Sequence, residues 1–191
     1  TSWNVDNDII NGPGLGGPLG ILNSPALVTV DAEESQGSTI VFENVLGMWE
    51  RLAPACKKRA VWLIGPGVFR ELATMGNIAG SDVLPVFTPA NGPLVEGYLS
   101  LFARPIIECE FCQVLGKKGD ILVCDMSDVV GIDKGKMETE TSLQLEFMSD
   151  RACIKTRYRF NSCPYTSAPI TPFRGGDTVS PYVTLAERAG E

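Results

Sequence analysis

The stretch Gly12-Pro13-Gly14-Leu15-Gly16-Gly17-Pro18-Leu19-Gly20 separates a helical beginning from a strand-rich remainder. Proline and glycine at this density interrupt both helices and strands, so the segment predicts a turn. Residues 3–11, just upstream, are typical of the end of a helix. Because a helical segment precedes the glycines and Pro18 follows them, the strand–turn–helix context of a dinucleotide-binding fingerprint is missing. We therefore interpret the turn as structural.

Downstream of this turn, short apolar runs alternate with turn signals. One helix is expected to begin at Ser38 or Thr39, either of which would cap it, and to end near 57–59, where three basic residues complement the helix dipole. An apolar stripe at helical spacing supports this helix: Ile40, Val41, Val45, Leu46, Trp49, Leu52 and Ala53. A second, short helix is expected at 68–75.

Strands are expected at 27–30, 60–64, 101–108, 121–124, 129–132, 141–147 and 154–160. Pro105 marks 101–108 as an edge strand, because proline cannot donate to a ladder. Residues 76–98 are rich in glycine and proline and predict a loop or hairpin, and 171–191 predict an exposed tail. This order of helices and strands predicts a mixed domain of the α+β class.

The composition excludes several classes of function. The 191 residues carry a net charge of −7 and contain no histidine, the commonest general base and metal ligand, which argues against a hydrolase. Neither half of the chain is strongly basic, as a nucleic-acid-binding protein would be. No apolar run of about 18 residues occurs, so we expect no transmembrane helix. The chain begins with Thr1, so we expect sequence upstream to be missing.

Two motifs suggest chemistry at first sight. Among the six cysteines only Cys109 and Cys112 have C-x-x-C spacing, whereas a zinc site needs a second pair. We expect reduced, mostly buried thiols and no cofactor. Asp120, Asp125 and Asp128 lack the central glycine and final glutamate of a calcium loop, so we interpret them as a polar turn.

Residues 154–160 alternate between two kinds of side chain, which predicts a strand with one buried face and one basic face. The basic face carries Lys155, Arg157 and Arg159. It could contact nucleic acid, or it could pair with acids of a neighbouring subunit. We favour the subunit contact because three bases are a small phosphate footprint. Candidate acids are Glu108, Glu110, Asp120 and Asp125.

Taken in order, the motifs resemble those of the HK97-like major capsid proteins of tailed phages. Five segments carry the resemblance: 17–23 (GPLGILN), 60–66 (AVWLIGP), 68–75 (VFRELATM), 101–107 (LFARPII) and 119–127 (GDILVCDMS). An aromatic residue and an arginine-rich strand, 147–160, close the series. Each motif alone is weak, and their common order is what makes the resemblance specific. It covers roughly residues 5–170.

The resemblance implies four segments. Residues 1–19 would end a peripheral-domain helix with its Gly-rich turn, 20–135 would form the axial domain, 136–170 would return to the peripheral domain, and 171–191 would be the C-terminal tail. The subunit-interface candidates are Lys155, Arg157, Arg159 and Asp150. Some family members cross-link through a lysine and an asparagine, but here Asp150 lies near the expected asparagine and the lysine loop is absent, so we do not transfer that chemistry.

The implied function is a non-enzymatic subunit that self-assembles, through pentamers and hexamers, into an icosahedral head shell. The shell would enclose phage dsDNA without binding it specifically, would assemble in the host cytoplasm and would involve no membrane. Scaffold, protease, portal or cement proteins would be its partners. A shell protein of an encapsulin-type nanocompartment is the alternative. A nucleotide-dependent enzyme is the third hypothesis, and the missing Walker pattern speaks against it.

Overall fold

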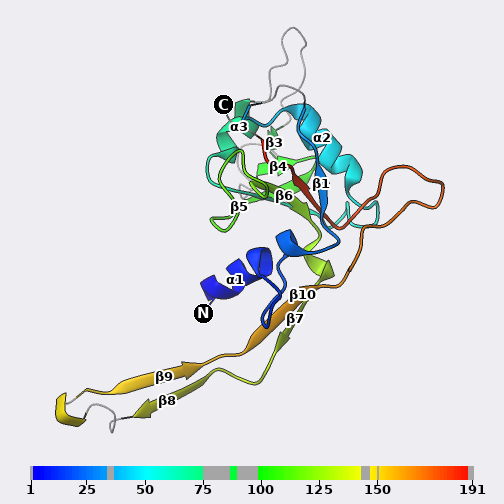
Figure 1. Ribbon diagram of the computed structural model, residues 1–191. Helices are drawn as coiled ribbons and strands as arrows, with labels where there is room; N and C mark the ends of the chain where they lie inside the picture. The colour runs from blue at the N-terminus through cyan, green and yellow to red at the C-terminus, as the bar shows by residue number, and fades with distance from the viewer. Residues whose placement is uncertain are drawn as a thin grey trace.

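The chain forms a body of helices around a sheet, from which a long two-stranded arm extends, as Figure 1 shows for the computed structural model. The structure describes residues 2–33, 37–74, 87–89, 99–142, 147–149 and 151–188. The α-helices are α1 (Ser2–Asn11), α2 (Phe42–Arg51) and α3 (Val68–Thr74), and the 3-10 helices are η1 (Ile21–Asn23), η2 (Met126–Asp128) and η3 (Phe147–Ser149). The body strands are β1 (Val28–Val30), β2 (Val61–Ile64), β3 (Phe87–Pro89), β4 (Leu99–Leu101), β5 (Arg104–Glu108), β6 (Ile121–Cys124) and β11 (Tyr182–Leu185). The arm strands are β7 (Val129–Asp133), β8 (Glu138–Ser142), β9 (Cys153–Arg157) and β10 (Phe160–Pro164).

Seven strands form one mixed sheet in the order β1-β11-β6-β2-β5-β4-β3. β1 pairs in parallel with β11, and β2 pairs in parallel with β5, whereas the other neighbours are antiparallel. Every residue of β6 and β11 is buried, because other elements cover both faces of the sheet. The α+β class predicted from the sequence is confirmed.

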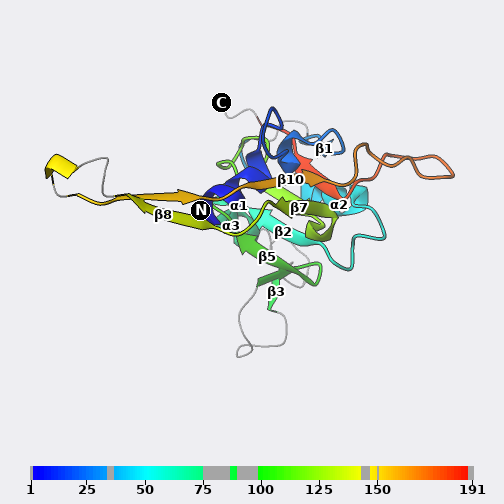
Figure 2. The ribbon, with the colours of Figure 1, turned by 90° about the horizontal axis from the view of Figure 1, so that it is seen from below.

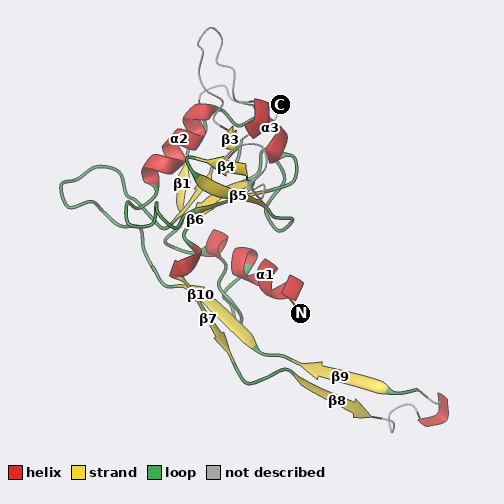
Figure 3. Cartoon of the chain, turned by 180° about the vertical axis from the view of Figure 1, so that it is seen from behind, coloured by secondary structure: helices red, strands yellow, loops and turns green. Residues whose placement is uncertain are grey.

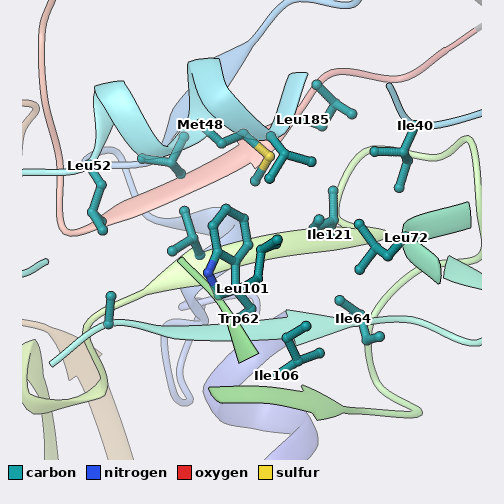
Figure 4. Close-up of a cluster of buried hydrophobic side chains, with 14 of the residues drawn as sticks. Ile40, Met48, Leu52, Trp62, Ile64, Leu72, Leu101, Ile106, Ile121 and Leu185 are labelled. Carbon is teal, nitrogen blue, oxygen red and sulfur yellow. The ribbon is translucent and has the colours of Figure 1, made fainter. Parts of the chain in front are cut away.

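Two apolar clusters lie on opposite faces of the sheet, because successive side chains of a strand point to opposite sides. In β2, Trp62 belongs to the first cluster and Leu63 to the second. Figure 4 shows the first cluster, in which Met48 of α2 lies over Trp62. Ile10 of α1 and Ile21 of η1 contribute to the second. The helical beginning of the chain therefore packs on the face opposite α2.

The arm consists of two consecutive antiparallel ladders, β7–β10 and β8–β9. Figures 2 and 3 show that β8 continues the direction of β7 and that the arm ends at η3. The strand expected at 154–160 is therefore two strands, separated at Tyr158 and Arg159. The strand expected at 141–147 is shifted to β8, and residues 143–146 lie outside the described residues.

The helix expected from Ser38 or Thr39 is shorter at both ends than predicted. It begins after Val41, whose N–H donates to the side chain of Asn44 (3.2 Å). It ends at Arg51, because the next residues leave the helix to pair with the C-terminal segment at Ser180. The basic residues 57–59 therefore lie in a turn and not at the helix end, and the stripe residue Leu46 is exposed.

The prediction of an edge strand at 101–108 is wrong. β4 and β5 form a hairpin, and β5 lies inside the sheet between β2 and β4. The turn residues Phe102 and Ala103 have φ of 51° and 58°, which residues other than glycine rarely adopt. The Phe102 ring stacks on Trp49 with 5.4 Å between ring centroids, and this packing holds a turn that local propensity does not predict. Pro105 precedes the β2 ladder, which begins at Ile106.

The prediction of an exposed tail at 171–191 is wrong for its second half. β11 is fully buried between β1 and β6, and Arg188 beyond it is buried as well. The composition of the segment suggests a tail, but two strand partners far away in sequence, β1 and β6, provide the burial. Most of the loop or hairpin expected at 76–98 lies outside the described residues, and β3 is its described part.

Candidate assembly surfaces

The basic residues of β9 have acidic partners within the same chain. Arg157 lies opposite Glu138 and Lys155 lies opposite Glu140 in the β8–β9 ladder. The Arg157 Nη1 to Glu138 Oε2 distance is 3.5 Å, and both side chains are largely exposed, so this ion pair contributes little to stability. The other face of β9 was predicted to be buried, and this prediction is wrong: Ile154, which lies on that face, is 69% exposed.

A cluster of cations lies where the two ladders of the arm meet. Lys134, Lys136, Arg157 and Arg159 line a concavity of about 270 Å³, together with Gly135 and Glu138. The chain turns here because Gly135 has φ of 77°, and the Lys134 N–H donates to the Arg159 carbonyl (3.0 Å). The structure therefore joins two of the predicted strip residues with two lysines that the sequence pattern did not single out. Asp150 lies outside the described residues.

Two of the acids expected to face a neighbouring subunit are buried within this chain. The Asp120 carboxylate accepts hydrogen bonds from Gly116 N–H (3.0 Å), Ile121 N–H (2.8 Å) and Arg188, and both charged side chains are fully buried. Burial raises the pKa of Asp120, although these bonds oppose the rise. The pattern of acids alone does not reveal this ion pair.

Asp125 lies in a second internal ion pair. It accepts two hydrogen bonds from Arg59 (2.8 and 3.1 Å) and one from the Ser127 N–H (3.0 Å). Burial alone would raise the pKa of Asp125, but the bonds from Arg59 and Ser127 hold it below its ordinary value. The predicted polar turn is confirmed at 125–128, where Asp125 caps η2. Neither Asp120 nor Asp125 is available to a neighbouring chain.

All six cysteines are free, and three of them are buried. Burial raises the pKa of the Cys112 thiol, as does neighbouring Cys109, so Cys112 is held in its protonated form at neutral pH. Burial and a hydrogen bond with Asp125 raise the pKa of Cys56 to about 11. Thiols held in the protonated form are poor nucleophiles, and the pair belongs to the packing between α1 and the sheet. In the described ranges, no group of three or more metal-ligating side chains is assembled.

The Gly-rich turn is a backbone crossing and not a phosphate cradle. Amide groups on both sides of the turn already have partners within the chain: Gly14 N–H donates to the Pro18 carbonyl and Leu19 N–H to the Ser162 carbonyl, both at 2.9 Å. A Cβ atom on Gly20 would lie 2.4 Å from the Gly12 nitrogen, so only glycine fits there. The structural interpretation of this turn is confirmed.

Large apolar side chains are exposed on both projections of the molecule. On the arm they include Ile132, Met137, Met148 and Ile154. On the loop between β10 and β11 they are Tyr165, Ile170 and Phe173. Exposed apolar groups gathered on projections are typical of contact surfaces. None of the described helices combines the length and the apolar character needed to cross a membrane.

The sequence matches the phage capsid family over residues 1–175, and the chain therefore belongs to that family. This family is one of structural, non-enzymatic proteins. A search of curated proteins finds no match. The fold is the HK97-like capsid fold that the motif order predicted.

Three solved structures have a similar fold. The capsid of an empty GTA particle, computed with C5 symmetry, is 10% identical in sequence, with a TM-score of 0.65. The match covers 100% of this chain and 66% of the GTA capsid chain. The capsid of the native GTA particle is 9% identical, matching 100% and 65%, with a TM-score of 0.60. The holo-SrpI encapsulin of Synechococcus elongatus PCC 7942 is 14% identical, matching 98% and 61%, with a TM-score of 0.62. The chain thus spans 61% to 66% of the length of these proteins.

Proposed function

We propose that this chain is the larger part of a major capsid protein, which assembles with its copies into an icosahedral shell around phage dsDNA. The observation that carries the proposal is the family match over residues 1–175, supported by a fold shared along the whole chain with the capsid of a GTA particle. The sheet body, including β11, would be the axial domain. The arm with α1 would be the peripheral domain.

The physical form of the arm supports self-association. A two-stranded ribbon without further packing is only marginally stable in water. The outer ladder, β8–β9, is exposed along almost its whole length, with Ile154 69% exposed and Met148 beyond it 99% exposed. In a shell, neighbouring copies would cover these side chains and add the packing that the outer ladder lacks within one chain. Repeated symmetric contacts are the work of such a subunit.

We also propose that the cation cluster at the bend of the arm, with Lys155 and Asp150 nearby in sequence, belongs to a subunit interface. Lys134, Lys136 and Arg159 have no ion-pair partner among the described residues, so they are the cations that remain for acids of another copy. Arg159→Glu would then lower assembly of the full-length protein, whereas Lys58→Glu, the same charge change on an exposed turn, would not. Unchanged assembly of the Arg159 variant would refute this assignment.

The net charge of −7 suits a container that holds nucleic acid without binding it tightly. An encapsulin-type shell is the second candidate, and the similarity to the holo-SrpI encapsulin favours it. The two differ in contents: a virion shell would enclose dsDNA, and a compartment would enclose protein cargo.

Expression of the full-length gene product, followed by electron microscopy, tests the proposal. Uniform closed shells would support it, and their contents would then distinguish a virion from a compartment. Only small, monodisperse particles, obtained over a range of salt concentrations and with any upstream protease or scaffold supplied, would contradict it.

A further inference from the structure

The loop of residues 165–179 projects from the body beside α2, as the orange hairpin in Figure 1 shows. Phe173 lies at its tip and is 103% exposed, so the ring makes no apolar contact within the described chain. The tip is a tight turn, closed by a hydrogen bond from Gly175 N–H to the Pro172 carbonyl (3.0 Å). Positive φ at Gly175 (83°) and Gly176 (110°) permits this turn.

The base of this projection is firmly anchored. Ile170 and Val179 exchange two backbone hydrogen bonds of 2.7 and 2.9 Å. Arg51 of α2 donates to the Thr178 carbonyl (2.6 Å) and to the Thr178 hydroxyl (2.9 Å). Ser180 N–H donates to the Arg51 carbonyl (3.1 Å). Because the stem is already ordered, docking of its tip would lose little conformational entropy.

The tip combines an aromatic ring with a cation. Aromatic residues and arginine are the types most enriched among the residues that dominate interface energies. Arg174 makes no ion pair within the described part of the chain, so both tip side chains are available to a partner. A partner for this tip would offer an apolar surface next to a carboxylate.

Such a surface lies on β5, which is separated from the projection by the sheet body (Figures 1 and 3). Ile107 is 44% exposed and Glu108 follows it, also exposed and without an ion pair among the described residues. β4 pairs with β5 only at Arg104 and Pro105, so Ile107 and Glu108 have no strand partner among the described residues on the side away from β2.

We propose that Phe173 and Arg174 of one copy dock on Ile107 and Glu108 of the next copy around a capsomer ring. A projection and an acceptor at different places on the subunit form a head-to-tail contact, and such contacts form a ring when the rotation between copies closes. The inference rests on the proposed shell function, which requires that closure. In this contact Phe173 packs on Ile107, and Arg174 pairs with Glu108.

A charge exchange in the full-length gene product tests this contact. Arg174→Glu and Glu108→Arg should each raise the protein concentration needed for assembly by at least about tenfold, because like charges would then face each other. The double variant should restore assembly to within about threefold of the wild type. Lys58→Glu serves as the charge control. Single variants without effect, or a double variant no better than the worse single one, would overturn the proposal.

A cross-link separates this inference from the proposed function. In a Cys163→Ser background, which removes the exposed native thiol, Phe173→Cys combined with Ile107→Cys should form a disulfide between copies under mild oxidation. Either single cysteine variant should not form it. Shells without this cross-link would refute the contact and leave the shell function intact. Cross-linked rings that never assemble into closed shells would support the contact and contradict the shell function. A protein that stays monomeric would refute both.

Discussion

Replacement of Arg188 by methionine should destabilise the folded chain by about 3 kcal/mol. Removing one partner of a buried ion pair typically costs about 3–5 kcal/mol, because the remaining charge is left without compensation. Asp120 is fully buried, so this range applies, and it would keep only its bonds from Gly116 N–H and Ile121 N–H. Two guanidinium nitrogens of Arg188 are themselves buried without a partner, and their removal offsets part of the loss. We therefore expect the lower end of the range.

Urea denaturation, followed by circular dichroism and by tryptophan fluorescence, to which buried Trp62 contributes, would measure the loss. The pH dependence gives a second test. The pKa of Asp120 is already raised in the folded state and should rise further without the arginine. A carboxyl with a raised folded-state pKa reduces stability above that pKa; the deficit shrinks as pH falls through it and is gone below the unfolded-state pKa. The variant should therefore approach the wild type as the solution is acidified.

The double variant Asp120→Asn, Arg188→Met is the matched control, because it removes both charges and should recover most of the stability. A loss of less than about 1 kcal/mol in Arg188→Met alone, within the range of ordinary surface substitutions, would refute the reasoning. So would a loss that the double variant does not reduce.

Three further predictions follow from single contacts. Asp125→Asn should lower the free energy of unfolding by about 1–3 kcal/mol near neutral pH, because Arg59 loses its charged partner. In the wild type the contribution of Asp125 should be present above about pH 4 and lost as pH falls through its lowered pKa, so an identical acid titration of stability in both proteins would contradict the prediction. Gly20→Ala should destabilise the chain by more than about 2 kcal/mol, because its Cβ would meet backbone atoms, whereas Gly17→Ala has open space and should change little; equal thermal denaturation of the two variants would argue against the crossing. In the native protein, Cys163 should react with a thiol reagent within minutes and Cys124 only on unfolding, since burial raises the Cys124 pKa to about 12; rapid labelling of both would show that the sheet opens readily.

Much of the fold could be predicted from local pattern. The apolar composition of the runs that form β2 and β6 is enough to predict buried strands. The glycines and prolines after α1 are enough to predict a turn, because they interrupt both helices and strands. The candidate surfaces could be predicted less well. The alternation at 154–160 correctly groups side chains by face, but whether a face is covered depends on a partner that the pattern does not contain. The 69% exposure of Ile154 is the result.

The sequence by itself determined the order of the elements, and that order was enough to indicate the capsid family. The tertiary structure alone decided three things: the place of β11 between β1 and β6, the pairing of Asp120 with Arg188, and the hairpin at Phe102. The physical reason is the same in each case. Local propensity acts over a few residues, whereas the strand partners, the buried countercharge and the stacking ring that decide these features come from distant parts of the chain.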